Sequence, residues 1–256
     1  MATGIHRIAI VGARGQMGSR FSADFAALGL DVAALDRRSS EEEIGRALAD
    51  CDMVLVCVPV TAMDAVIDRL VPGLAAPTIL CDVGSVKVLP MKAMTDRYDG
   101  PVVGTHPLFG PVIPDGFEPR VAVMPGRERD ARAAEAVADL FTRCGYACFT
   151  TTPQDHDRAM AYIQGLNFTS TVAFLAAARD VEGIRDFVTP SFQRRLDSAA
   201  KMLTQDGELF EVISEANPFL QEVSRRFMSY LSLAAGGDLE LLAGRAQWWW
   251  RNDESY

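Results

Sequence analysis

Residues 7–18 read RIAIVGARGQMG, which places a glycine-rich loop directly between a strand-like segment and an amphipathic stretch. The apolar run at 7–11 predicts a buried strand, and the periodicity that follows the loop predicts a helix. In this context Gly12 permits a tight turn, Gly15 lets a pyrophosphate approach the backbone, and Gly18 lets the helix pack closely on the strand. We therefore expect a dinucleotide at the helix N-terminus. The residues expected to contact it are Gly12, Gly15, Gln16, Met17 and Gly18.

The ends of the next two strand-like segments indicate which dinucleotide binds. DVAALD ends at Asp36, roughly 20 residues beyond the loop, where a carboxylate accepts hydrogen bonds from the ribose hydroxyls of NAD. The same carboxylate repels the ribose phosphate of NADP, although Arg37 or Arg38 could turn toward such a phosphate or stack on the adenine. The third segment ends CVPV, and Val58 and Pro59 are expected to form a rigid edge of the cofactor crevice. The sequence therefore favours NAD.

The chain as a whole divides into two patterns. Its 256 residues fit two domains better than one core. Up to residue 149, short β-branched runs alternate with amphipathic stretches, which predicts a Rossmann-like, doubly wound parallel sheet of the α/β class. The rest reads as helix after helix, so we predict a dinucleotide-binding domain at 1–152 and an all-helical domain at 153–256. The expected strands begin at Arg7, Asp31, Asp52, Thr78, Pro101, Arg120 and Tyr146.

Composition and charge exclude several classes of function. A net charge of −9 repels polyanions, so no nucleic-acid partner is expected. No apolar stretch approaches the ~20 residues of a membrane span, and the first residues lack a signal-peptide core, so we expect a cytoplasmic protein without a membrane partner. The five cysteines are expected to be free thiols, and no further Cys or His pair completes a zinc site with Cys144 and Cys148. We therefore expect no metal.

Two polar residues are predicted at the carboxyl ends of later strands, where doubly wound folds place ligands and catalytic groups. Ser85 lies in CDVGSVK, at a strand-to-helix transition, where it could be a helix N-cap, a nicotinamide or substrate contact, or both. His106 lies in VVGTHPLFGP, and an imidazole there can act as a general base near neutral pH. The alternative for His106 is a buried, structural role.

Five segments taken together resemble the prephenate dehydrogenase family of tyrosine biosynthesis. They are GARGQMG, CVPV, DVGSVK, GTHPLFGP and QDHDRAMAYIQGL. The resemblance extends over nearly the whole chain, and the last two segments are much more specific than the nucleotide loop. It is closest to the form that is fused to chorismate mutase in some bacteria. We expect neither that extra domain nor a regulatory ACT domain here.

The resemblance implies oxidative decarboxylation of prephenate to 4-hydroxyphenylpyruvate, with hydride transfer to NAD. In the family, the histidine matching His106 hydrogen-bonds the ring hydroxyl and takes its proton. Ser85 would orient His106 or the nicotinamide, and His156 would enter the site from the helical domain, which would bind substrate. Prephenate dehydrogenases pair through their helical domains, so we expect a homodimer. The tryptophans at 248–250 are expected in its interface or in the core of the chain itself.

Prephenate is a dianion, so the site needs cations. In the family an arginine of the helical domain clamps a substrate carboxylate, and an ungapped reading places Lys201 at that position, with Arg194 and Arg195 one to two turns upstream. Lysine cannot form the bidentate fork of arginine. Either Lys201 binds as a point charge, or a neighbouring arginine replaces it, or the substrate differs. The expected substrate contacts are His156, Lys201 and Arg195.

Two alternatives remain open at this point. The departure at Lys201 keeps a dehydrogenase for arogenate or for an amino-substituted prephenate in consideration. A protein of another class, a non-catalytic dinucleotide-binding sensor, would retain the fold but not the chemistry. The presence of both His106 and Ser85 argues against the sensor.

Overall fold

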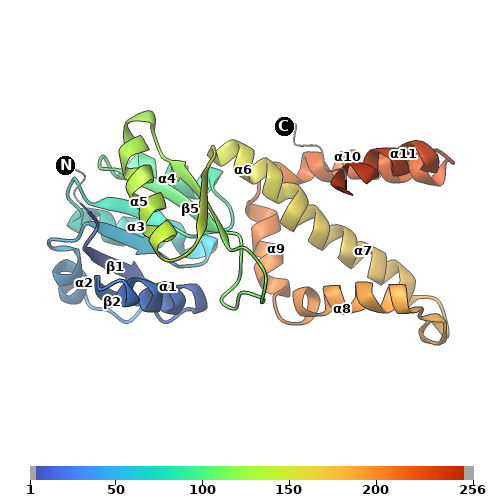
Figure 1. Ribbon diagram of the computed structural model, residues 1–256, viewed down its shortest axis with the longest axis horizontal. Helices are drawn as coiled ribbons and strands as arrows, with labels where there is room; N and C mark the ends of the chain where they lie inside the picture. Colours follow the sequence, from blue (N-terminus) through green and yellow to red (C-terminus); the bar gives the residue numbers. More distant parts are fainter. Residues whose placement is uncertain (1–3, 251–256) are drawn as a thin grey trace.

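The computed structural model describes residues 4–250, which form a sheet domain and an arm of helices that extends away from it (Figure 1). The prediction of a Rossmann-like α/β domain followed by a helical part is confirmed. All seven predicted strands are present in one sheet, in the order β2-β1-β3-β4-β5-β6-β7. They are β1 (Arg7–Val11), β2 (Asp31–Leu35), β3 (Met53–Val56), β4 (Ile79–Asp82), β5 (Val102–Pro107), β6 (Arg120–Pro125) and β7 (Ala147–Thr150).

The sheet is mostly parallel, as predicted, and its last two strands depart from the parallel arrangement. Strands β1 to β5 are parallel, but β6 runs antiparallel to β5 and β7 is parallel to β6. Parallel neighbours need a crossover, usually through a helix, whereas residues 108–119 join β5 to β6 without one. The chain therefore re-enters the sheet at the edge where β5 ends. His106 pairs there with Ala122 of β6.

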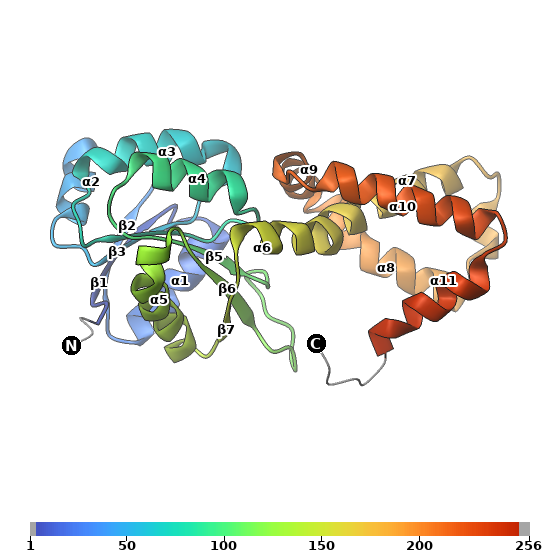
Figure 2. The same cartoon turned by 90° about the horizontal axis from the view of Figure 1, so that it is seen from above.

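Helices cover both faces of the sheet. Figure 2 shows α2, α3 and α4 on one face and α1 and α5 on the other. One apolar cluster lies under each set, and neither has a buried member beyond Tyr146. Helix α2 begins with a capping box, in which Ser40 and Glu43 exchange hydrogen bonds. The helices are α1 (Gln16–Ala27), α2 (Glu41–Leu48), α3 (Met63–Leu70), α4 (Val88–Arg97) and α5 (Ala131–Arg143).

The helical arm begins directly after the sheet. Thr152 accepts the N–H of Asp155, and Pro153 occupies the first turn of α6. A π-helical segment, Ala161–Leu166, joins α6 to α7, so the two form one rod (Figure 2). None of the helices in residues 4–250 is long and apolar enough to cross a bilayer. The arm contains α6 (Pro153–Met160), α7 (Asn167–Arg179), α8 (Pro190–Thr204), α9 (Gly207–Ala216), α10 (Leu220–Ala235) and α11 (Leu239–Ala246).

Candidate active site

The glycine-rich loop can be built only with glycine at two of its positions. Gly12 has a φ of +84°, and a Cβ there would lie less than 3.0 Å from the carbonyl oxygen of Cys57. A Cβ on Gly18 would come equally close to the carbonyl oxygen of Gly12, so α1 packs against the turn without side-chain space. Gly15 closes the turn by donating its N–H to Gly12 over 2.9 Å. The loop therefore brings bare backbone to the N-terminus of α1, as a pyrophosphate requires.

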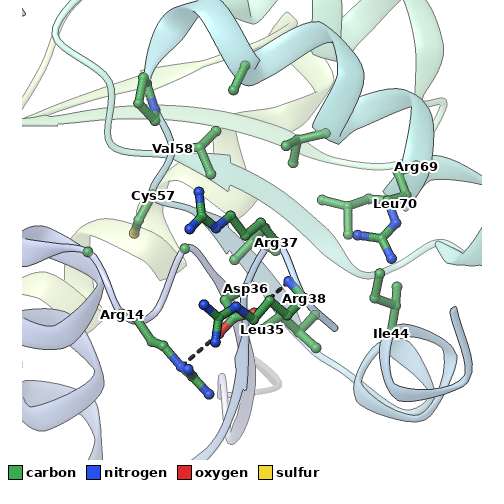
Figure 3. Close-up of a pocket in the computed structure, with 16 residues that line it drawn as sticks. Arg14, Leu35, Asp36, Arg37, Arg38, Ile44, Cys57, Val58, Arg69 and Leu70 are labelled. Carbon is green, nitrogen blue, oxygen red and sulfur yellow. Dashed lines mark hydrogen bonds and ion pairs between the residues drawn. The ribbon is translucent and has the colours of Figure 1, made fainter. Parts of the chain in front are cut away.

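A pocket of about 560 Å³ opens beside this loop, at the carboxyl ends of β1, β2 and β3 (Figure 3). Its size and its mostly apolar walls fit the adenosine half of a dinucleotide. Four of the predicted cofactor contacts do not line it: Gln16, Met17 and Gly18, which belong to α1, and Ser85, which follows β4. The predicted contacts that do line it are Gly12, Gly15, Asp36, Arg37, Val58 and Pro59.

Asp36 is not a free carboxylate in this pocket. Its Oδ1 accepts the N–H of Arg38 over 2.7 Å, and its Oδ2 lies 2.7 Å from Nε of Arg14 (Figure 3). The Arg14 side chain is 78% exposed, so water screens the pair and the guanidinium can leave at little cost. Arg69 also lines the pocket. Sequence reasoning missed Arg14 and Arg69, although Arg14 lies inside the motif itself.

The second part of the site is a buried pair of histidines. His106, at the end of β5, is only 3% exposed, and its Nδ1 lies 2.8 Å from Nε2 of His156 on α6. The two rings meet edge to face, with centroids 5.0 Å apart. The two residues are 50 positions apart in the chain. His156 was expected at this site as a substrate contact, and that role stays a prediction. Nε2 of His106 has no protein partner among residues 4–250.

Burial lowers the pKa of His106 well below its usual value, and the neighbouring His156 and Lys87 lower it further. A lowered pKa keeps the imidazole neutral at pH 7. The neutral ring is the form that can accept a proton, as a general base must. The structural alternative for His106 does not account for a ring nitrogen left without a partner at the ligand-binding edge of the sheet.

Asp157 holds the histidine pair in place from the other side. Its Oδ1 lies 2.8 Å from Nδ1 of His156 and accepts the N–H of Lys87, and its Oδ2 accepts the N–H of Val88. These two N–H groups open α4, so the carboxylate caps a helix of the sheet domain from the helical arm. Asn217 adds a bond from its side-chain amide to the carbonyl of Asp157 over 2.8 Å. The residues that join the two domains thus also form the floor of the site.

A buried ion pair supports His106 from beneath. Lys87 and Asp82 are both fully buried, with Nζ and Oδ2 2.5 Å apart. Nζ of Lys87 also donates to the carbonyl oxygen of Thr105, the residue before His106, over 2.8 Å. Burial raises the pKa of Asp82, and the ammonium of Lys87 opposes that rise. The pair therefore ties the carboxyl ends of β4 and β5 together next to the catalytic candidate.

Ser85 does not have the N-cap role that the sequence suggested. Helix α4 begins at Val88, its N-cap residue is Lys87, and the carboxylate that caps it comes from Asp157. The hydroxyl of Ser85 makes no hydrogen bond in the described part of the chain, and the residue is half-buried in the loop after β4. A contact of Ser85 with nicotinamide, substrate or His106 stays a prediction.

The cations expected to bind substrate lie on α8. Lys201 is exposed, and its Nζ lies 3.5 Å from Oδ2 of Asp206. The guanidinium carbon of Arg195 lies 3.7 Å from the centroid of the Phe174 ring, on which it stacks. Neither they nor the exposed Arg194 bonds to the histidine pair. Helix α9, about 15 Å long at 1.5 Å per residue, lies between the end of α8 and Asn217. The structure therefore does not bring these side chains to the histidines within one chain, and their role stays a prediction.

Sequence reasoning also missed Lys87, Asp82, Asp157 and Asn217. Two of them carried a signal. Lys87 is a lone cation in the apolar segment VGSVKVL, and Asp157 directly follows His156. Across residues 4–250, no group of three or more His, Cys, Asp or Glu side chains is arranged to hold a metal ion. All five cysteines are free thiols, as expected.

The fold and the glycine cradle define a dinucleotide-binding protein of the Rossmann class. Residues 21–149, half of the chain, match the family model for the nucleotide-binding domain of prephenate dehydrogenase. The chain belongs to the prephenate dehydrogenase family. The resemblance stated from the motifs and the expectation of a nucleotide cofactor are thereby confirmed.

Individual relatives agree with this assignment. The chain is 30% identical to the T-protein of Enterobacter agglomerans over 90% of its own length and 63% of that protein. It is 25% identical to the probable arogenate/prephenate dehydrogenase of Methanocaldococcus jannaschii, over 87% of its length and 54% of the relative. It thus spans less than two thirds of either. The crystal structure of a putative prephenate dehydrogenase from Corynebacterium glutamicum has the same fold, with a TM-score of 0.80, 18% identity, and coverage of 96% of this chain and 88% of that one.

Proposed function

We propose that this chain catalyses the oxidative decarboxylation of prephenate to 4-hydroxyphenylpyruvate, with NAD as the hydride acceptor. The observation that carries the proposal is His106, a buried imidazole with one nitrogen unpartnered, at the sheet edge that also holds the dinucleotide pocket. Burial lowers its pKa, which favours the neutral ring. A non-catalytic sensor has no need of such a base. Family membership supports the same reaction class.

In this proposal NAD, when bound, accepts a hydride from the ring carbon that carries the hydroxyl. Nε2 of His106 takes the hydroxyl proton, so that the electrons of the O–H bond form the carbonyl-like C–O bond. Loss of carbon dioxide from the quaternary carbon then leaves the electrons of the broken C–C bond in the ring, which becomes aromatic as the phenolate oxygen takes a proton back from the histidine pair. Gly12, Gly15 and Asp36 would hold the cofactor, and the pocket walls at Val58 and Pro59 would exclude water from it.

The test of the function is a comparison of two substrates. The purified protein is mixed with NAD and prephenate, then with NAD and arogenate, and reduced nicotinamide is followed by absorbance. We expect turnover with prephenate that is at least 10-fold faster, in kcat/KM, than with arogenate. Faster turnover with arogenate would support the alternative that the departure at Lys201 left open, and turnover with neither would favour the sensor.

We also propose the assignments that accompany this reaction. Lys201 or Arg195 remains the expected clamp for a carboxylate of the dianionic substrate, and Ser85 a contact of nicotinamide or substrate. The compartment proposed is the cytoplasm, where five free thiols stay reduced. No nucleic-acid or membrane partner belongs to the proposal.

Asp36 gives a prediction about cofactor preference. We expect NAD to bind more tightly than NADP, and Asp36→Asn to shift the ratio of the two dissociation constants at least ~10-fold toward NADP. The substitution removes the carboxylate that repels the ribose phosphate of NADP. It also releases Arg14, whose Nε lies 2.7 Å from Oδ2 of Asp36 in the parent protein, to bind that phosphate. Calorimetry with both nucleotides measures the ratio. Asp31→Asn, at the exposed start of β2, the strand that Asp36 follows, should leave the ratio unchanged.

Parent protein that bound NADP as tightly as NAD would contradict this preference. Arg37, which lines the same pocket, would then be the residue that determines it.

We propose that the helical arm pairs two copies of the chain. Both apolar core clusters belong to the sheet domain, and α7 has no buried residue at all. Of the large hydrophobic side chains that are exposed in residues 4–250, sixteen of twenty lie at or beyond Tyr162. Trp248, Trp249 and Trp250 are among them, at 47%, 67% and 79% exposed, so packing in the chain's own core does not explain them. A second copy would cover this surface.

The dimer proposal predicts a change in association. Met228 and Leu231 are more than half exposed and lie three residues apart on α10. We expect Met228→Glu with Leu231→Glu to raise the dimer dissociation constant at least ~10²-fold, because two charges would replace apolar contacts. Sedimentation equilibrium measures it, and Gln221→Glu, exposed on the same helix, is the control. A parent protein that sediments as a monomer at micromolar concentration would rule the dimer out.

A further inference from the structure

The chain of hydrogen bonds that ends at His106 starts at the carboxylate of Asp157, a group that accepts hydrogen bonds and cannot donate them. Both oxygens of Asp157 receive backbone N–H groups, from Lys87 and Val88, at 2.8 Å each. The carboxylate is fully buried and lies at the N-terminus of the ten-residue helix α4, where the helix dipole favours a negative charge. Its position is therefore fixed by the sheet domain, while its backbone belongs to the helical arm.

This acceptor determines where the proton lies on His156. Nδ1 of His156 is 2.8 Å from Oδ1 of Asp157, and a hydrogen bond to a carboxylate requires that Nδ1 carry the proton. Nε2 of a neutral His156 then has a lone pair and no proton, so it can only accept a hydrogen bond. Nδ1 of His106, 2.8 Å from this Nε2, must in turn carry a proton and donate the hydrogen bond.

From these contacts we infer that Asp157 is a positioning residue, which acts through His156 to fix the tautomer of His106 so that Nε2 is its basic atom. The inference rests on the proposed function for the use of that base, but not for the tautomers themselves. With the opposite tautomer, Nε2 of His106 would carry a proton and could not accept the hydroxyl proton of a substrate. No role was assigned to Asp157 from the sequence.

The same hydrogen bonds provide a route by which a proton taken from the substrate can be passed on from His106 to His156. When Nε2 of His106 gains a proton, the proton on Nδ1 can pass to Nε2 of His156, so that His106 remains neutral. The positive charge then lies on His156, 2.8 Å from a carboxylate, instead of beside the ammonium of Lys87. The charged groups that face the pair are thus Asp157 from α6 and Lys87, with its partner Asp82, from the β4 side.

The first test needs neither substrate nor a variant. In protein labelled with ¹⁵N histidine, long-range ¹H–¹⁵N correlation spectra report which ring nitrogen carries the proton. We expect both His106 and His156 to be protonated on Nδ1 at pH 7.5. His6, the third histidine and an exposed one, supplies the reference spectrum. Finding the proton of His106 on Nε2 would overturn the inference even if the chain proves to be a prephenate dehydrogenase.

The second test is Asp157→Asn, with Asp155→Asn as the matched control. Asp155 lies on the same helix, two residues away, with its side chain 65% exposed. We expect Asp157→Asn to lower kcat by about 10²-fold, the scale of losing a correctly poised base, with NAD affinity unchanged. The acid limb of the pH profile should also move to lower pH, because the carboxylate no longer stabilises the protonated pair.

Outcomes of this second test are separable. A drop in kcat with an unmoved pH profile and unmoved histidine spectra would mean that Asp157 only holds the two domains together. If the variant does not fold, the spectra of the parent protein still decide the question. Asp155→Asn should retain parental kcat, profile and spectra.

Discussion

Replacing His106 with Asn is expected to lower kcat by about 10²-fold or more, the usual scale for loss of a general base. Nε2 of His106 is the ring nitrogen that the protein leaves unpartnered, and an amide cannot take its proton. NAD affinity should not change, because His106 does not line the dinucleotide pocket. Steady-state kinetics and calorimetry measure the two quantities, and His6→Asn, at an exposed position, is the control.

The parent enzyme should also show where this base titrates. Burial lowers the pKa of His106, so the basic form persists as the pH falls below the usual value of 6.5. The acid limb of kcat/KM is therefore expected below pH 6.5 and should be absent from the residual activity of His106→Asn. Turnover close to that of the parent in the variant would make His106 a structural residue, and the proposed mechanism would be wrong.

Local patterns were enough to predict the nucleotide half of the site. The turn at Gly12 and the close packing at Gly18 depend on residues within a few positions of each other, and strand periodicity places Asp36 and Pro59 at the same edge. The direction of β6 was not predictable in this way. An apolar strand reads the same in either direction, and only the connection at 108–119 determines how it enters the sheet.

The supporting groups of the catalytic half could not be predicted from local patterns. The carboxylate of Asp157 meets backbone N–H groups 70 and 69 residues earlier in the chain, and backbone donors leave no mark in a sequence. Lys87 stands out in the sequence as a lone cation in an apolar segment, but that pattern does not indicate which buried group its ammonium meets. The position of Lys201 depended on an ungapped reading, and α8 holds it one helix length from the junction at Asn217.

Lys87→Met is expected to cost about 3 to 5 kcal/mol in the free energy of unfolding at pH 7, because it leaves a buried carboxylate without its counter-charge. Oδ2 of Asp82 would keep only the N–H of Gly84, at 2.8 Å, and its Oδ1 has no partner within the described residues. Urea denaturation measures the loss. Lys92→Met, on the exposed side of α4, breaks only a solvated pair and should cost less than about 0.5 kcal/mol.

Two further measurements distinguish whether Lys87→Met loses stability through an uncompensated charge or through lost packing. They are the pH dependence of the loss in free energy of unfolding and the effect of adding Asp82→Asn. Burial already raises the pKa of Asp82, and removing Lys87 raises it further, so the carboxyl is more easily protonated in the folded variant than in the unfolded chain. A raised pKa of this kind adds stability at low pH, which disappears as the pH rises through the folded value. The deficit of Lys87→Met should therefore shrink as the pH is lowered. Adding Asp82→Asn should recover part of the deficit at pH 7, since neither position 82 nor position 87 then carries a charge. A deficit that is constant with pH and unrelieved by Asp82→Asn would mean that lost packing of the lysine stem, and not the uncompensated carboxylate, destabilises the variant.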